Sequence, residues 1–152
     1  MKYFIKGLMM LGPFAYAVVA YANLNIVVMM NKKSEITALT TSQLQAYYKA
    51  QMIKLPNGGR IRLCSQKDNR LRADFYKSIG VNEDEAFAQL EQNNAKSVST
   101  GQSQNEVRLK EVSSNEDVEN FLKRNPEGGI CYCTQEEFMI LNKNSLVKQV
   151  YP

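Results

Sequence analysis

The side chains of this sequence that could carry out chemistry are few, and one type is missing. There is no histidine among the 152 residues. Without imidazole, neither a Ser-His or Cys-His couple nor a two-histidine metal site can form, which removes the commonest hydrolase and oxygenase constellations. The doublets Gly58-Gly59 and Gly128-Gly129 lie in no G-x-G-x-x-G or Walker pattern. We therefore predict a protein that is not an enzyme and that needs no cofactor.

Acidic residues cluster at Glu83-Asp84-Glu85, Glu116-Asp117 and Glu136-Glu137. The first two clusters fall in the first turns of predicted helices, where negative charge interacts favourably with the helix dipole. We interpret them as helix-stabilising charges rather than as paired catalytic carboxylates.

Three cysteines are the remaining reactive groups, Cys64, Cys131 and Cys133. Cys131 and Cys133 flank Tyr132 in a predicted strand, and we expect them to point to opposite faces and not to bond to each other. A disulfide from one of them to Cys64 and a buried thiol are the two structural alternatives. A Cys-only metal site lacks the usual ligand spacing and has no histidine to complete it, so no metal is predicted.

The N-terminus has the pattern of a secretory leader. Lys2 and Lys6 precede an uncharged apolar run from Gly7 to Ala22, as in the n-region and h-region of a signal peptide. The run is shorter than the roughly 20 apolar residues of a membrane-spanning helix. Ala20-Tyr21-Ala22 matches the A-x-A cleavage pattern, so we expect cleavage after Ala22. The alternative is an uncleaved N-terminal anchor.

Cleavage would divide the chain into a signal peptide at 1–22 and one exported domain at 23–152. Loss of the two leader lysines lowers the net charge from +4 to +2. A chain so close to neutral, with scattered Lys and Arg, gives no reason to expect nucleic acid as a partner. We expect a periplasmic or secreted bacterial protein with no membrane insertion after signal cleavage.

Apolar periodicity and capping residues predict alternating strands and helices. Helices are expected to begin after caps at Thr40, at Asp68 or Asn69, at Asn82, and at Ser113 or Ser114, with the first running to about Met52. The polar stretch Gln92 to Asn105 is predicted to be a loop. This order indicates an α/β domain with a mainly parallel sheet flanked by helices. The predicted strands are Asn25–Met30, Ile61–Cys64, Ile130–Cys133 and Leu146–Tyr151.

Five short motifs follow one another along residues 26–132. They are Ile26-Val27-Val28-Met29-Met30-Asn31-Lys32, Leu39-Thr40-Thr41-Ser42-Gln43-Leu44, Leu55-Pro56-Asn57-Gly58-Gly59-Arg60-Ile61, Leu71-Arg72-Ala73-Asp74-Phe75-Tyr76 and Asn125-Pro126-Glu127-Gly128-Gly129-Ile130-Cys131-Tyr132. In this order they resemble the phosphate ABC transporter substrate-binding proteins. The resemblance implies a single periplasmic-binding-protein-like lobe of type II, without the second lobe that completes a closing cleft.

The same resemblance places an anion site at the start of the helix after the second strand. In the family, backbone N–H groups, a Ser-Gly-Thr run and a preceding arginine hold the anion, and helix N-termini favour phosphate. The matching positions here are Ser65 for the arginine and Asn69, Arg70 and Leu71 for the run. Leu71 has no side-chain donor, and Arg70 replaces the glycine. The predicted contact set is Ser65, Lys67, Asn69, Arg70, Arg72, Ser99 and Thr100.

Two functions fit these features. The first is binding of phosphate or another small oxyanion, to feed a transporter or to sense the ion, with weak affinity because one lobe buries little of a ligand. The second is an envelope scaffold that binds another protein or a transporter partner and has lost solute binding. Under the second interpretation, the residues at the helix start are solvated charges and a helix cap.

Overall fold

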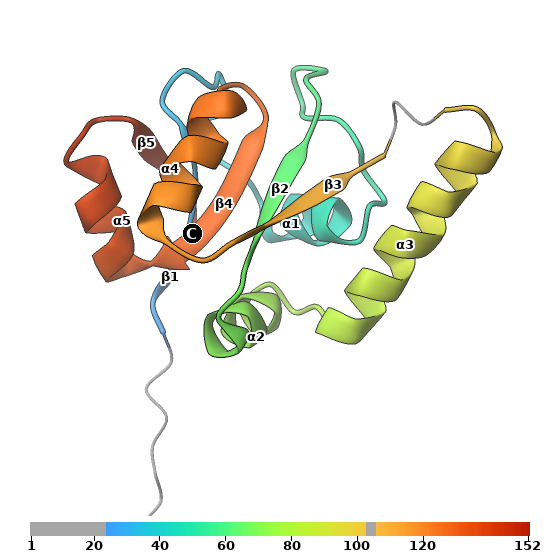
Figure 1. The fold of residues 1–152 in the computed structure, drawn as a ribbon, viewed down its shortest axis with the longest axis horizontal. Helices are drawn as coiled ribbons and strands as arrows, with labels where there is room; N and C mark the ends of the chain where they lie inside the picture. Colours follow the sequence, from blue (N-terminus) through green and yellow to red (C-terminus); the bar gives the residue numbers. More distant parts are fainter. Residues whose placement is uncertain (1–23, 103–105) are drawn as a thin grey trace, which may run out of the picture.

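The computed structural model describes residues 24–102 and 106–152. Its centre is one five-stranded sheet with helices on both faces (Figure 1). The strands are β1 (Ile26–Asn31), β2 (Arg62–Gln66), β3 (Arg108–Val112), β4 (Gly129–Thr134) and β5 (Val147–Tyr151). The helices are α1 (Thr41–Tyr48), α2 (Asn69–Ser78), α3 (Glu83–Ser99), α4 (Asn115–Arg124) and α5 (Gln135–Asn142). The predicted signal peptide lies outside the described residues.

The sheet has the strand order β3-β2-β4-β1-β5 and is mixed. Strand β2 runs parallel to β3 and β4, whereas β1 runs antiparallel to β4 and β5. The predicted α/β layering is confirmed, and four of the five strands, β2, β3, β4 and β5, run in one direction while β1 runs opposite to them. The continuous apolar run of β1 reflects burial on both faces, which any covered central strand requires, and it carries no information about strand direction.

Two cores lie on opposite faces of the sheet. Side chains of β1 alternate between them: Val28 and Met30 join the core under α1, α2 and α3, and Val27 and Met29 join the core under α4 and α5. This alternation is the period-two geometry of a strand. It fixes which residues of neighbouring strands face each helical layer.

Helix starts agree with the predicted caps. Thr40 and Gln43 form a reciprocal capping box, and Asp68, Asn82 and Ser114 each accept a backbone N–H at the start of a helix. Helix α1 ends at Tyr48, earlier than predicted. Ala50 follows with φ of 52°, and Met52, predicted to lie on the buried face, is exposed.

The predicted loop from Gln92 to Asn105 is instead largely helical, because α3 continues to Ser99. Two asparagine side chains hold this polar half of the helix in place. Asn93 donates to the carbonyls of Lys49 and Ala50 at 3.2 Å, and Asn94 exchanges two hydrogen bonds with the backbone of Val107 at 3.0 Å. Polar side chains therefore do the anchoring that apolar ones do in the first half of α3.

The cysteines form one disulfide and one free thiol. Cys64 on β2 is bonded to Cys131 on β4, with Cα atoms 5.0 Å apart. The expectation that Cys131 and Cys133 point to opposite faces is wrong: both lie in the α4–α5 core, because residues two apart on a strand share a face. Cys133 is a buried free thiol, and burial raises its pKa to about 12.

Neither a metal-binding cluster nor a membrane-spanning helix is found in the described part of the chain. Residues 24–102 and 106–152 hold no group of three or more metal-ligating side chains. Over the same residues, no helix has both the length and the apolar character needed to cross a bilayer.

Candidate functional site

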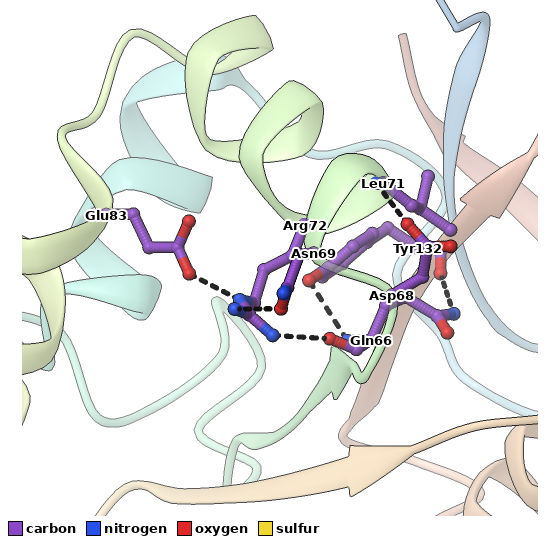
Figure 2. Close-up of polar contacts among 7 residues, drawn as sticks. All are labelled: Gln66, Asp68, Asn69, Leu71, Arg72, Glu83 and Tyr132. Carbon is purple, nitrogen blue, oxygen red and sulfur yellow. Dashed lines mark hydrogen bonds and ion pairs between the residues drawn. The ribbon is translucent and has the colours of Figure 1, made fainter.

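The predicted anion site lies where β2 ends and α2 begins, and a carboxylate of the chain already occupies the helix start. Asp68 is the N-cap of α2, and its Oδ1 accepts the Leu71 N–H at 2.8 Å (Figure 2). A cap of this kind satisfies one of the donors that a helix leaves free at its N-terminus. Its negative charge also takes the position that the helix dipole would offer to a bound anion.

Arg72 is turned into the protein at this site rather than out toward a ligand. Figure 2 shows its guanidinium between Glu83 of α3 on one side and Gln66 and Asn69 on the other. Nε forms an ion pair with Glu83, and this hydrogen bond raises the pKa of Arg72. Nη1 donates to the Gln66 carbonyl at 3.2 Å, and Nη2 donates to Asn69 Oδ1 at 2.8 Å. All three guanidinium nitrogens therefore have acceptors within the chain.

Tyr132 of β4 packs against the end of β2 and against α2. Its hydroxyl accepts the Gln66 N–H at 3.1 Å, and its carbonyl accepts the Gln66 side-chain amide at 2.7 Å. The buried Ser65 side chain also hydrogen-bonds to Tyr132. The Tyr132 ring stacks on Phe75 of α2, with centroids 3.8 Å apart. Burial raises the pKa of Tyr132, so its phenol stays neutral and can keep these bonds.

The structure gathers some of the predicted contact residues and separates others. Ser65, Asn69 and Arg72 lie in the network just described, and the side chains of Lys67 and Arg70 are exposed beside it.

Ser99 and Thr100 do not join this cluster. They lie at the opposite end of α3 from Glu83, about 24 Å along the helix at 1.5 Å per residue. Their hydroxyls donate to the carbonyl of Lys96 in their own helix. The prediction placed them near the helix start because it treated residues 92–105 as a loop.

Four residues that shape this region were missing from the predicted contact set: Gln66, Asp68, Glu83 and Tyr132. Asp68 was expected only as a possible helix cap. Glu83 was interpreted only as a dipole-stabilising charge in a helical first turn. Its ion pair with Arg72 joins α3 to α2, so the residue pattern within either helix could not predict this contact. Tyr132 is 66 residues from Gln66, and only the strand pairing brings the two together.

Comparison with known proteins bears on the fold. No protein-family model matches the sequence, and no curated protein is significantly similar to it. Among solved structures, an ABC-type phosphate transport receptor from Vibrio cholerae superposes with a TM-score of 0.57, over 84% of this chain and 45% of the receptor. This chain has a phosphate-receptor-like fold.

The phosphate-receptor-like fold is shared at low sequence identity, 16% for the Vibrio cholerae receptor. A putative phosphate ABC transporter substrate-binding protein with bound phosphate, from Clostridium perfringens, superposes with a TM-score of 0.53 and 12% identity, over 83% of this chain and 53% of that protein. The chain spans about half the length of these proteins. That partial coverage fits the single lobe expected from the sequence.

Proposed function

We propose that this chain is a non-catalytic, exported protein that uses a phosphate-receptor-like lobe as an envelope scaffold for protein interaction. The observation that carries the proposal is the closed start of α2. Asp68 caps the helix, and Arg72 is bound by Glu83, Gln66 and Asn69. The position at the start of α2 where the family resemblance places phosphate is thus occupied by side chains of the chain itself.

Electrostatics at the closed start of α2 disfavour an added anion. A phosphate approaching this helix end would have to displace the Asp68 carboxylate from the Leu71 N–H. It would also lie near Glu83, the partner of Arg72. Like charges at close range repel by about 4 kcal/mol at 4 Å when the effective dielectric constant is about 20. The two carboxylates therefore oppose the binding that the helix dipole alone would favour.

Export is supported by the disulfide and by the fold. The bond between Cys64 and Cys131 suits an oxidising compartment, since disulfides are rare in reducing cytosol. Two solved structures of similar fold are an ABC-type phosphate transport receptor and a putative phosphate ABC transporter substrate-binding protein. Both agree with a signal peptide at residues 1–22, cleaved after Ala22.

Oxyanion binding is the second candidate function. The similar protein from Clostridium perfringens was solved with bound phosphate, and Lys67 and Arg70 are exposed beside the start of α2. A single lobe would bury such a ligand on one side only, so its affinity would be weak. Transport or sensing of the ion would then need a transporter partner.

Phosphate or sulfate at 10 mM is expected to leave the thermal midpoint unchanged, because a ligand that does not bind the folded form cannot stabilise it. Asp68→Ser keeps a neutral capping oxygen and removes the charge, so this variant is expected to gain a phosphate-dependent shift. Asp84→Ser, which removes an exposed carboxylate from the first turn of α3, is the matched control and should gain none. A shift in the wild type that Arg72→Gln abolishes would contradict the proposal and support oxyanion binding.

A tagged copy of the full chain is expected to co-purify with a specific envelope protein from extracts of its source organism. The scaffold proposal requires such a partner because a scaffold acts by holding another protein. The measurement is size-exclusion chromatography of the purified material, with an unrelated exported protein carrying the same tag as control. Recovery of the chain only as a monomer would count against a scaffold.

A further inference from the structure

A second charged region lies on the other face of the sheet, away from α2. A groove of about 390 Å³ opens between α4 and strands β2 and β3, which lie next to each other in Figure 1. Its volume falls in the range of small-molecule pockets, roughly 300–1,000 Å³. We call it the β2–β3 groove. Its charged lining consists of Arg62, Arg108, Lys110, Arg124 and one carboxylate, Asp117.

Strand register gathers these cations. Arg62 of β2 pairs with Arg108 of the parallel strand β3, so the two side chains start about 4.8 Å apart on one face. Lys110 lies two residues after Arg108 and therefore on the same face. Arg124 comes from the last turn of α4. The groove runs from Arg62 and Arg108 at the start of the two strands to Val112, which pairs with Gln66 at their other end. It is separated from α2 because the two lie on opposite faces of the sheet.

The cations of the groove are poorly compensated within the chain. Among the described residues, the ion pairs are Arg72–Glu83 and Lys123–Glu119, and neither involves a groove residue. Asp117 accepts hydrogen bonds from the backbone and side chain of Ser113, at 3.1 and 2.9 Å. Asp117 also interacts at longer range with Lys110.

Burial and neighbouring positive charges both act on Arg62. Its side chain is partly buried, and its Nη1 donates to the carbonyl of its neighbour Ile61 at 3.0 Å. Burial, then the charges of Arg108 and Arg60, lower the pKa of Arg62. Repulsion of this kind is relieved when an anion binds between the cations.

We propose that the β2–β3 groove binds a small polyvalent oxyanion, a ligand that carries two or more linked phosphate or carboxylate groups. Arginine forks bind both kinds of group in a bidentate manner. Cations from two strands and a helix surround the groove, so they can contact several charged groups at once. Val112 and Phe121 line the same groove and can pack against the part of the ligand that joins its charges. This site is independent of the scaffold function and of the start of α2.

Isothermal titration of the full chain tests the groove with orthophosphate, tripolyphosphate and citrate at one ionic strength, because screening changes with salt. We expect tripolyphosphate or citrate to bind at least about tenfold more tightly than orthophosphate. The stronger of the two identifies whether linked phosphates or linked carboxylates are the preferred chemistry. Equal affinity for all three anions, or no binding, would overturn the proposal.

Paired variants separate a built site from general charge attraction. Arg62→Gln/Arg108→Gln is expected to weaken polyvalent-anion binding at least about tenfold. Lys32→Gln/Lys143→Gln removes the same charge from exposed positions outside the groove and should leave binding unchanged, as should Arg72→Gln. The thermal midpoint of the groove variant without ligand should not fall, since the substitution relieves repulsion. Equal losses in the groove and control variants, or unchanged binding in the groove variant, would refute the site. A response to orthophosphate that depends on Asp68 or Arg72 bears on the scaffold proposal instead.

Discussion

Replacing Cys64 and Cys131 together with alanine is expected to lower the free energy of unfolding by about 4 kcal/mol. The disulfide joins residues 67 apart in sequence, and a cross-link over a loop of that length removes much conformational entropy from the unfolded chain. It also ties β2 to β4 at the centre of the sheet. Domains of ordinary size are stable by about 5–15 kcal/mol, so this single bond supplies a large part of the margin.

Urea unfolding measures the loss, and reductant supplies the matched control. Dithiothreitol should lower the midpoint of the wild type but leave that of Cys64→Ala/Cys131→Ala unchanged. The chain has three cysteines, one of them free. The unfolded, unreduced protein should therefore show one thiol that reacts with Ellman's reagent, and three after reduction. Three reactive thiols before reduction would show that the disulfide is absent.

Helix starts could be predicted because capping is local. An N-cap and the residue three positions later decide most of the signal, and Thr40 with Gln43 shows it within four residues. Strand β1 could be predicted in the same way, because a strand buried on both faces has an unbroken run of apolar residues. Such features need no knowledge of what lies across the sheet.

Strand β3 was missed because its sequence does not look like a strand. Of its five residues, only Val112 is buried, and β3 is an edge strand paired with β2 alone. Charged residues on an edge protect it from pairing with other chains. In β3 these charged residues stand where an alternating apolar pattern would have indicated a strand.

Helix α5 carried a signal that was overlooked. Thr134 and Glu137 form a capping box, which the spacing of the two residues could have indicated. The helix begins directly after β4, with no turn residue between them. Its acidic first turn was noted as a charge cluster but was not assigned to a helix.

The two polar sites could not be predicted in the same way, because long-range pairing builds them. Gln66 meets Tyr132 only through the β2–β4 arrangement. Arg62 meets Arg108 only through the register of β2 and β3. Scattered cations in a nearly neutral sequence therefore gave no sign that four of them line one groove.

Alkaline pH is expected to destabilise the protein steeply, because buried acids, among them Tyr48, Tyr76, Tyr132 and Cys133, keep their protons only while the chain is folded. Tyr48 lies edge-on to Phe75, Tyr76 and Tyr132 in one aromatic cluster. Burial raises the pKa of each of these three tyrosines, and in Tyr48 and Tyr76 the charge of an ionised Tyr132 raises it further. On the other face, burial raises the pKa of Cys133 to about 12.

The sign of the effect follows from proton counts. The unfolded chain loses these protons above about pH 8.5 for cysteine and about pH 10 for tyrosine, while the folded chain retains them. The unfolded state then binds fewer protons, so the free energy of unfolding falls as pH rises. Each group contributes about 1.4 kcal/mol per pH unit. The stabilisation from these protons is fully present below about pH 8.5. Once these four groups are protonated in the folded chain and ionised in the unfolded chain, the free energy of unfolding should fall by roughly 5 kcal/mol per pH unit.

Urea midpoints between pH 8 and pH 11 measure this slope, and tyrosinate absorbance reports the coupled ionisation. For the buried tyrosines, absorbance should rise together with the loss of secondary structure and not before it. Tyr76→Phe should reduce the slope by about 1.4 kcal/mol per pH unit, because one proton is removed from the difference. If Tyr48, Tyr76 and Tyr132 ionised near pH 10 in a chain that stayed folded, burial could not be what holds their protons.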